Sequence, residues 1–347
     1  MTKTWGFGII GAGTIADFHA RAIQSLPNAR LVGISGSNYR KTAELAEKYN
    51  CKAFQSYQEM LLSDKIEIVT IATPSGAHME PAVEAAQKGK HVICEKPLDI
   101  SLERIDKMME AHAKAGTCLG GIFNYRFNST IQLLKTAIDE GRFGTITYAS
   151  VQVPWWRSDD YYKSSWRGTW KLDGGGALMN QSIHMIDILQ YLVGPVESLR
   201  AYIATLGHSI EVEDTATASL QFKNNALGHI YGTTASYPGQ FRRLEITGTK
   251  GTVIMVENSF TVWQFADQSA TDAEIINKFS QIEGGGGVSD PKAIPFELHA
   301  KNFEAFIKSI EEGNRFEIDA AEARKAVEII LAIYSSAKEN KTYVFPG

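Results

Sequence analysis

Lys96 stands at a point of the sequence where a lysine could do acid–base chemistry. The tripeptide Glu95-Lys96-Pro97 directly follows the apolar run 89–94, which predicts a buried strand. Open α/β folds bind ligands at the carboxyl ends of their parallel strands, which is where Lys96 would lie. Its amine could orient a substrate hydroxyl and share its proton, and Pro97, for which a cis bond is one option, could fix the turn that aims it. The competing interpretation is an ordinary Lys-Pro turn.

His184 is a second candidate for proton transfer. It follows Asp173 and the three glycines at 174–176, whose backbone could pass close to a ligand or to another domain. Asn180 lies four residues before it and Asp187 three residues after it, so a helix would place all three on much the same side. Asp187 could then fix the tautomer of the imidazole. A lone histidine in an apolar helix is more often a core residue, but the glycines and polar partners favour a functional histidine here.

Aromatic residues are concentrated between 155 and 170, where four of the six tryptophans of the chain lie. Flat apolar rings beside hydrogen-bonding groups suit the binding of pyranose rings. For most of these aromatics, the better interpretation is that they anchor a long loop against a sheet. We expect Arg167, beside Trp166, to reach the substrate or the cofactor. The residues concerned are Trp155, Trp156, Arg157, Tyr161, Tyr162, Trp166, Arg167 and Trp170.

The beginning of the chain predicts a dinucleotide-binding strand, turn and helix. The apolar strand 5–10 runs into Gly11-Ala12-Gly13-Thr14-Ile15-Ala16, and a helix is predicted over 17–26. Gly11 would make the tight turn and Gly13 would let the backbone approach a pyrophosphate. The phosphates would bind at the helix N-terminus, beside Thr14 and Ile15, where N–H groups and the helix dipole favour anions. A plain tight turn is the alternative to this fingerprint.

The residues after the second predicted strand (29–34) favour NADP over NAD. NAD sites usually place a carboxylate here for the ribose 2′-hydroxyl, and none is present between 35 and 41. Ser37 and Arg40 could instead receive a 2′-phosphate. The alternative is that these residues are solvated and merely open the next helix.

A further turn, Thr73-Pro74 with His78, follows the predicted strand 65–72. It would lie at the same sheet edge, so its backbone and His78 could contact the nicotinamide ribose. Helix capping by Ser75 or His78 is the alternative.

The sequence divides into two domains of different character. Residues 1–123 alternate strands and helices, as a Rossmann domain does, whereas residues 124–347 contain many short alternating strands and tight turns. The second domain should therefore be an α/β domain built on an open, mostly antiparallel sheet. Two amphipathic helices are predicted near the end, over 297–312 and 320–338, and Gly284–Gly287 is expected to be a mobile loop.

Composition limits the classes of partner. The chain has 347 residues, 44% hydrophobic and 21% charged, with a net charge of −4. These values predict a globular cytoplasmic protein and argue against nucleic acid or membrane as partners. Cys51, Cys94 and Cys118 are too widely spaced for a disulfide framework or a zinc site, so we expect no metal.

Several motifs together resemble the glucose–fructose oxidoreductase/inositol dehydrogenase (Gfo/Idh/MocA) family, over nearly the whole chain. The resemblance implies hydride transfer between NAD(P) and a secondary alcohol of a sugar or cyclitol, and an open sheet that forms homodimers or homotetramers. It makes Lys96 the catalytic lysine and His184 a catalytic acid/base or substrate ligand, with Arg126 near the nicotinamide and Glu95 and Pro97 at the cofactor. The motifs, in family order, are Gly11-Ala12-Gly13, Thr73-Pro74, Glu95-Lys96-Pro97, Asn124-Tyr125-Arg126-Phe127, and Gly174-Gly175-Gly176 through His184 and Asp187.

One departure bears on the substrate. Inositol dehydrogenases of the family carry aspartate where this chain has Asn180, and an amide can hold a hydroxyl but cannot share a proton. Asn180-Gln181 is more similar to family members that act on amino-sugar or uronate nucleotides and on glycosides. Two other functions remain open on the sequence: a redox-assisted glycosidase, which oxidises its sugar only transiently, and a non-catalytic nucleotide-binding regulator.

Overall fold

The chain folds into two compact units. The computed structural model describes residues 3–163, 166–282 and 296–346, so the predicted loop Gly284–Gly287 lies outside the described residues. The first unit takes its described residues from 1–124 and 295–324, and the second takes its own from 125–294 and 325–347. The sequence predicts a single division between 123 and 124. The structure also returns a late segment to the first unit, where the Gly121 N–H donates to the Ile318 carbonyl.

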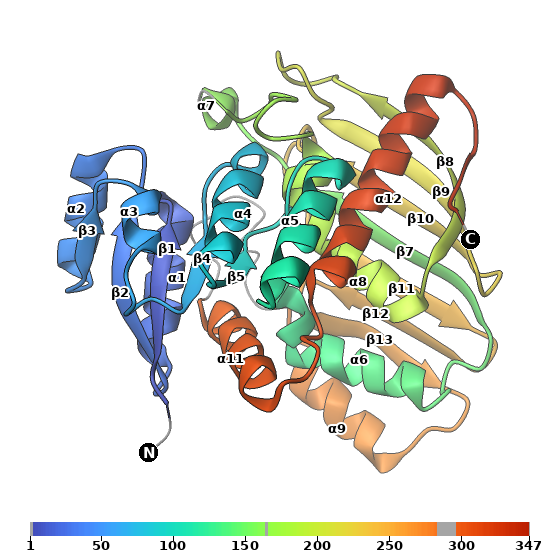
Figure 1. The fold of residues 1–347 in the computed structure, drawn as a ribbon. Helices are drawn as coiled ribbons and strands as arrows, with labels where there is room; N and C mark the ends of the chain where they lie inside the picture. The colour runs from blue at the N-terminus through green and yellow to red at the C-terminus, as the bar shows by residue number, and fades with distance from the viewer. Residues whose placement is uncertain (1–2, 164–165, 283–295, 347) are drawn as a thin grey trace. The chain divides into compact units, whose positions relative to one another are not determined.

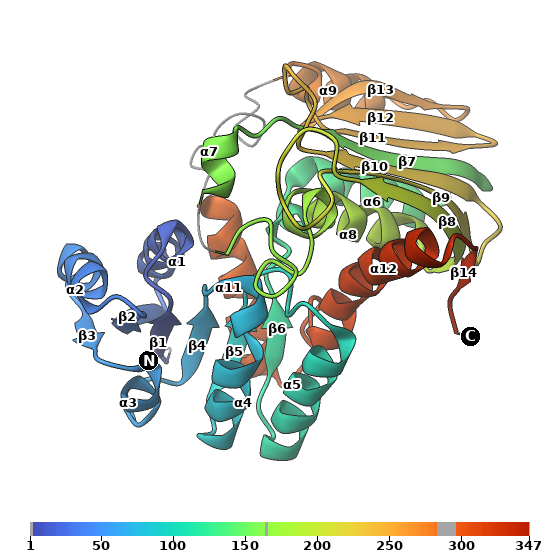
Figure 2. The ribbon, with the colours of Figure 1, turned by 90° about the horizontal axis from the view of Figure 1, so that it is seen from above.

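The first unit is the predicted Rossmann domain. Its six strands are all parallel, in the order β3-β2-β1-β4-β5-β6 (Figure 1). The order reverses beside β1, where doubly wound sheets bind ligands. Figure 2 shows α1 and α11 on one face of this sheet and α4 and α5 on the other.

The strands are β1 (Trp5–Ile10), β2 (Ala29–Ser35), β3 (Lys52–Phe54), β4 (Ile68–Ile71), β5 (His91–Cys94) and β6 (Leu119–Gly121). The helices are α1 (Thr14–Ser25), α2 (Tyr39–Lys48), α3 (Tyr57–Leu61), α4 (Met79–Gln87), α5 (Leu102–Ala115) and α11 (Glu297–Glu312), with the 3-10 turn η1 (Ser75–Ala77).

Local sequence signals explain these boundaries. β1 is buried at every position, as its apolar sequence predicts. α5 begins after Ser101, whose side chain accepts the Arg104 N–H, and ends at Gly116 in the left-handed conformation, at φ 65°.

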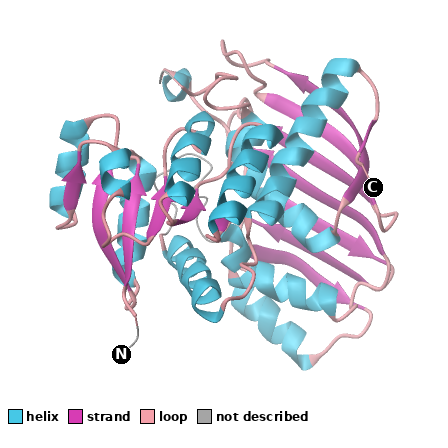
Figure 3. Ribbon diagram, in the orientation of Figure 1, coloured by secondary structure: helices cyan, strands magenta, loops and turns pink. Residues whose placement is uncertain are grey.

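The second unit contains the predicted open sheet (Figure 3). Its strand order is β13-β12-β11-β7-β10-β9-β8-β14, and β7 with β10 is the parallel pair of this otherwise antiparallel sheet. Helices α6, α8 and α12 cover one face in Figure 2, and along β9 buried and exposed residues alternate. The strands are β7 (Ile146–Pro154), β8 (Val196–Ala204), β9 (Thr215–Phe222), β10 (Leu227–Thr233), β11 (Arg243–Gly248), β12 (Gly251–Val256), β13 (Ser259–Phe265) and β14 (Tyr343–Val344). The helices are η2 (Asn124–Phe127), α6 (Ser129–Asp139), α7 (Asp159–Tyr162), η3 (Ala177–Ser182), α8 (Ile183–Val193), α9 (Ala270–Phe279) and α12 (Ala320–Glu339).

The elements that the sequence did not predict include β3, α9 and the π-helix η3. η3 matters most, because it precedes α8 and carries Asn180. Across the described residues, no helix combines the length and the apolarity that crossing a membrane requires.

Candidate active site

The turn between β1 and α1 leaves space for a pyrophosphate. Gly11 has φ +124°, and a Cβ there would lie 2.4 Å from the Ala72 carbonyl oxygen, so only glycine fits. Gly13 is the N-cap of α1, and a Cβ there would meet nothing within 4 Å. The first turn, with Thr14 and Ile15, therefore opens onto free space at the positive end of a helix dipole, which suits a dinucleotide.

The residues expected to receive a 2′-phosphate lie exposed after β2. Asn38 caps α2 by accepting the Lys41 N–H, and Ser37 precedes it. Arg40 donates to Glu44 at 3.1 Å, one turn further along the same helix. Arg40 is thus already paired within α2, and its use for a phosphate would require that pair to open.

His78 connects the turns that follow β4 and β5. Its ring is 1% exposed, with Nδ1 2.9 Å from the Pro97 carbonyl oxygen and Nε2 2.9 Å from the Thr73 carbonyl oxygen. The Thr73 hydroxyl donates to the Ala77 carbonyl within the turn that Pro74 begins. The structure therefore gives the imidazole a role in tying two turns together, whereas the sequence suggested contact with the ribose or a helix cap.

The turn after β5 presents Lys96. Within residues 92–99, Lys96 alone is half-exposed and all the others are buried. The Lys96–Pro97 bond is cis. Lys96 thus lies accessible at the carboxyl edge of the parallel sheet, as its place in the sequence predicted.

Glu95 has a different environment from the one expected of a cofactor ligand, because its carboxylate lies inside the first unit. Oε1 is 2.9 Å from Nε2 of His19 and 3.4 Å from Nε2 of His299. Burial alone would raise the pKa of Glu95, but hydrogen bonds from the two histidines hold it well below its usual range. Burial also lowers the pKa of His19. These three side chains place potential metal-ligand atoms within 4.8 Å of one another.

In the second unit, the side chains of Asn180 and His184 are more exposed than their neighbours along the chain. Within residues 173–190, they alone are half-exposed. The four-residue spacing predicted a shared α-helical face, but Asn180 lies in the π-helix and His184 in the first turn of α8. Single π-helical turns are frequent at functional sites. The Asn180 amide donates to Asp173 at 2.7 Å, which orients its side chain.

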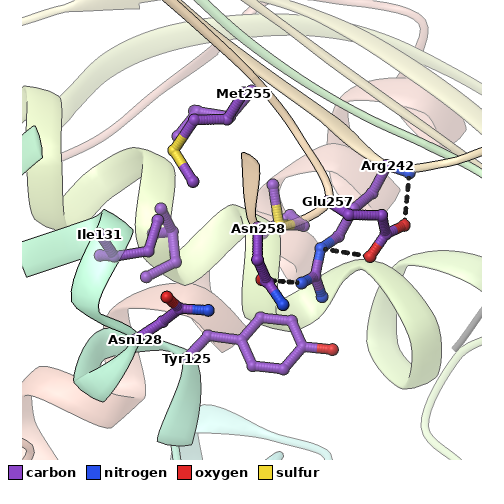
Figure 4. Close-up of a pocket in the computed structure, with 10 residues that line it drawn as sticks. Tyr125, Asn128, Ile131, Arg242, Met255, Glu257 and Asn258 are labelled. Carbon is purple, nitrogen blue, oxygen red and sulfur yellow. Dashed lines mark hydrogen bonds and ion pairs between the residues drawn. The ribbon is translucent and has the colours of Figure 1, made fainter. Parts of the chain in front are cut away.

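His184 stacks on Tyr125, a residue that the sequence analysis did not assign to the site. The ring centroids are 4.5 Å apart and the planes 24° apart. The Arg242 guanidinium lies 4.1 Å from the Tyr125 ring centroid and pairs with Glu257 and Asn258. Figure 4 shows Tyr125, Arg242, Glu257 and Asn258 where they line a small cavity, together with Asn128, Ile131 and Met255. Tyr125 thus connects the imidazole to a fixed ion pair.

Arg126 and Asp187 bind each other. Nε and Nη2 of Arg126 donate to the two carboxylate oxygens at 2.8 and 2.6 Å, and both residues are 1% exposed. The guanidinium also lies 4.4 Å from the Tyr191 ring centroid. The sequence predicted Arg126 near the nicotinamide and Asp187 as the partner of His184. The structure shows a buried bidentate ion pair between them.

Tyr161 gathers the polar groups of the aromatic segment. The guanidinium carbons of Arg167 and Arg157 lie 4.2 and 5.5 Å from its ring centroid, and the Gln181 amide donates to its hydroxyl at 3.0 Å. Burial lowers the pKa of Arg157, and the positive charge of Arg167 acts in the same direction. Trp166 lies half-exposed, 5.0 Å from Arg167. Two cations therefore lie near one ring beside the π-helix. From the sequence, Tyr161 is named only among the clustered aromatics and Gln181 only in the family comparison, and neither is assigned a role in the site.

Comparison with known proteins places both units. Residues 5–122 match the model of an oxidoreductase family with an NAD-binding Rossmann fold, and residues 131–254 match the GFO/IDH/MocA C-terminal domain. Myo-inositol 2-dehydrogenase of Thermotoga maritima is 31% identical over 71% of this chain and 73% of its own. D-glucoside 3-dehydrogenase of Escherichia coli is 27% identical over 95% and 94%. The crystal structure of the WlbA dehydrogenase from Bordetella pertussis, in complex with NADH and UDP-GlcNAcA, covers 99% of both chains at 33% identity, with a TM-score of 0.90.

Proposed function

The chain belongs to the Gfo/Idh/MocA family of NAD-binding oxidoreductases, and from that premise we propose that it oxidises a secondary alcohol of a sugar derivative to a ketone. The observation that carries this proposal is the exposure of Lys96, Asn180 and His184 within segments that are otherwise buried. Each of the three is a polar group that can bind a hydroxyl, and two of them can accept its proton. The open helix terminus at Gly13 supports the binding of the nucleotide.

The roles of the residues follow from the balance of the reaction. A bound nicotinamide nucleotide supplies the acceptor for the hydrogen and electron pair of the C–H bond. The hydroxyl proton must leave separately, and we assign it to Lys96 or His184, either of which accepts a proton only when neutral. Asn180 holds a substrate hydroxyl through its amide without taking a proton. Tyr125 keeps the His184 ring in place by stacking.

We propose a sugar nucleotide that carries a carboxylate as the substrate class. Arg157 and Arg167 concentrate positive charge around Tyr161, next to Gln181. A carboxylate would pair with a guanidinium through charge-assisted hydrogen bonds. The Bordetella relative holds UDP-GlcNAcA, which has such a group. Neutral D-glucosides, after the Escherichia coli relative, are the second candidate class.

We propose NAD as the working nucleotide, although the sequence favoured NADP. The Bordetella relative holds NADH, and in this chain Arg40 pairs with Glu44 on its own helix. Quenching of protein fluorescence by NADH and NADPH compares the two dissociation constants directly. NADPH binding about tenfold tighter than NADH would return the preference to NADP.

The function can be tested by following the reduced-nicotinamide absorbance band. Purified protein is given NAD+ or NADP+ with UDP-GlcNAcA, UDP-GlcNAc, D-glucosides and myo-inositol, alongside Lys96→Ala. We expect reduction with one substrate class, a loss of at least about 100-fold in turnover for Lys96→Ala, and an unchanged affinity for NADH. Equal losses of turnover and NADH affinity would contradict the assignment of Lys96. Sugar release without net nucleotide reduction would favour the redox-assisted glycosidase.

We propose that a second copy of the chain covers the open face of the sheet in the second unit. Tyr148, Tyr202 and Leu227 are exposed on it, and Leu227 pairs with Tyr148 across β10 and β7. Light scattering after gel filtration should show a dimer or tetramer for the native chain. Changing Tyr148 and Leu227 together to Glu should give a monomer, whereas Leu62→Glu, at an exposed leucine of the first unit, should not.

A further inference from the structure

We propose that His19, Glu95 and His299 form a buried positioning cluster, which holds the Lys96 turn in its reactive orientation and fixes a negative charge beside it. The proposal rests on the proposed function, because it takes Lys96 as the residue that exchanges the proton. None of the three cluster residues needs to touch the substrate or the nucleotide. Their effect would reach the reaction through Lys96.

The geometry of Glu95 carries the proposal. Its Oε1 receives both imidazoles, at 2.9 Å from His19 and 3.4 Å from His299. Its Oε2 accepts the backbone N–H of Lys96 at 3.2 Å. One carboxylate therefore ties the turn that bears Lys96 to two helices, α1 and α11.

The far nitrogen of each ring is also held, which fixes the ring orientations. Nδ1 of His19 lies 2.9 Å from the Thr70 hydroxyl, on β4. Nδ1 of His299 lies 3.2 Å from the Asn124 amide nitrogen, which can only donate. With the Asn124 amide in this orientation, His299 would carry its proton on Nε2 and donate it to Glu95, and His19 would do the same if the Thr70 hydroxyl donates. With both rings in these tautomers, two neutral imidazoles would donate to one ionised carboxylate, and the cluster would have a net charge of −1.

A buried negative charge next to Lys96 has two consequences. It favours the ammonium form of the Lys96 amine. The positive nicotinamide of the oxidised nucleotide has the opposite effect and favours the neutral amine. It also depends on its donors, because removing one leaves a buried charge without compensation. Loss of an imidazole should therefore loosen the turn, and a space-filling apolar residue should not restore it.

His299 offers a direct test with a matched control. His299→Leu fills the space without a donor, whereas His299→Gln keeps an amide N–H near the position of Nε2. The control is His112→Leu, because His112 is likewise a buried histidine of the first unit and its Nδ1 lies 2.7 Å from the Thr117 hydroxyl rather than near Glu95. With NAD+ and UDP-GlcNAcA, or the substrate class found above, we expect His299→Leu to lower kcat about 10- to 100-fold with NADH affinity within about twofold. His299→Gln should retain most of the activity, and His112→Leu nearly all of it.

A second measurement reports on Lys96 without any turnover. Reductive methylation with 13C-formaldehyde gives each lysine an NMR signal whose pH titration can be followed, and the signal missing from Lys96→Arg identifies Lys96. Glu95→Gln removes the negative charge, so the titration midpoint of Lys96 should move to lower pH, by about half a unit or more. His112→Leu should leave the midpoint unchanged.

The outcomes separate the two proposals. If Lys96→Ala keeps its activity, the proposed function fails at its central residue. If Lys96→Ala is inactive but His299→Leu behaves like His112→Leu, or Glu95→Gln leaves the Lys96 midpoint unmoved, the cluster has no positioning role.

Mass spectrometry of the purified protein gives a third check. One bound transition metal per chain, lost together with activity on chelation, would make these residues metal ligands and overturn the hydrogen-bonded cluster.

Discussion

The hydrogen-bond partners and the burial of a polar side chain indicate whether it takes part in chemistry or in folding. Asp187 is an example of a residue that takes part in folding. Its two oxygens accept from Arg126, and Gln190 lies 3.4 Å from one of them. A carboxylate that is 1% exposed and bidentately paired is part of the folded core of its unit.

Asp187→Asn should therefore act on stability. Removing one charge of a buried pair leaves the Arg126 cation uncompensated, and we expect a loss of roughly 3–5 kcal/mol in the free energy of unfolding. Guanidinium chloride titrations followed by circular dichroism measure it. Glu44→Gln, which breaks the exposed pair with Arg40, should cost less than about 0.5 kcal/mol and serves as the comparison. Native stability in Asp187→Asn, together with a fall in kcat/KM, would return Asp187 to the role of partner to His184.

At the scale of elements, the turn from β1 to α1 separates folding from binding at neighbouring glycines. Gly11 is enclosed, with positive φ and the Ala72 carbonyl in the way of any Cβ, whereas Gly13 faces open space. The same substitution at the two positions should therefore have different consequences.

Gly11→Ala should destabilise the first unit by about 2 kcal/mol or more, because both the conformation and the space exclude a Cβ. Gly13→Ala should leave the melting temperature of the nucleotide-free protein nearly unchanged. It should weaken NADH binding at least about tenfold, because its methyl group would occupy space that the pyrophosphate needs. Thermal unfolding with and without NADH measures both effects. A Gly13→Ala protein that binds NADH normally would place the nucleotide elsewhere.

The elements also show what the sequence could predict. The β1–α1 fingerprint, the strand before Lys96 and the alternation in β9 are local signals, and each placed its element correctly. The π-helix at Asn180 was missed because η3 depends on tertiary contacts: the Gly176 and Leu178 N–H groups donate to Glu213, and a Cβ on Gly176 would lie 1.8 Å from the Glu213 carbonyl oxygen. His299 was missed for a similar reason, since it meets Glu95 across some two hundred residues of chain and no local pattern records that meeting.

At the scale of the whole molecule, two buried groups make the units respond to pH in opposite ways. In the first unit, burial lowers the pKa of His112 to about 4 from an ordinary 6.5. In the second, burial raises the pKa of Glu213 to about 7 from an ordinary 4.5, although the Gly176 and Leu178 N–H groups and the Tyr334 hydroxyl donate to it.

Linkage gives the sign of each effect. Between pH 6.5 and 4, the unfolded His112 binds a proton that the folded one does not, so the first unit loses stability as the pH falls. Between pH 4.5 and 7, the folded Glu213 keeps a proton that the unfolded one releases, so the second unit loses stability as the pH rises. Each shift corresponds to about 3 kcal/mol over its full range, at 1.36 kcal/mol per pKa unit.

Scanning calorimetry from pH 4.5 to 8 should therefore show the two transitions moving in opposite directions. NADH identifies the transition of the first unit, because a ligand raises the melting temperature of the unit that binds it. His112→Gln should flatten the pH dependence of the NADH-sensitive transition only, and Glu213→Gln that of the other transition only. A single transition whose pH dependence neither variant changes would mean that the units unfold together and that these groups do not control the acid and neutral limits of stability. Two transitions that each respond to their own variant would show that the nucleotide-binding unit sets the acid limit of the molecule and the sheet-bearing unit its neutral limit.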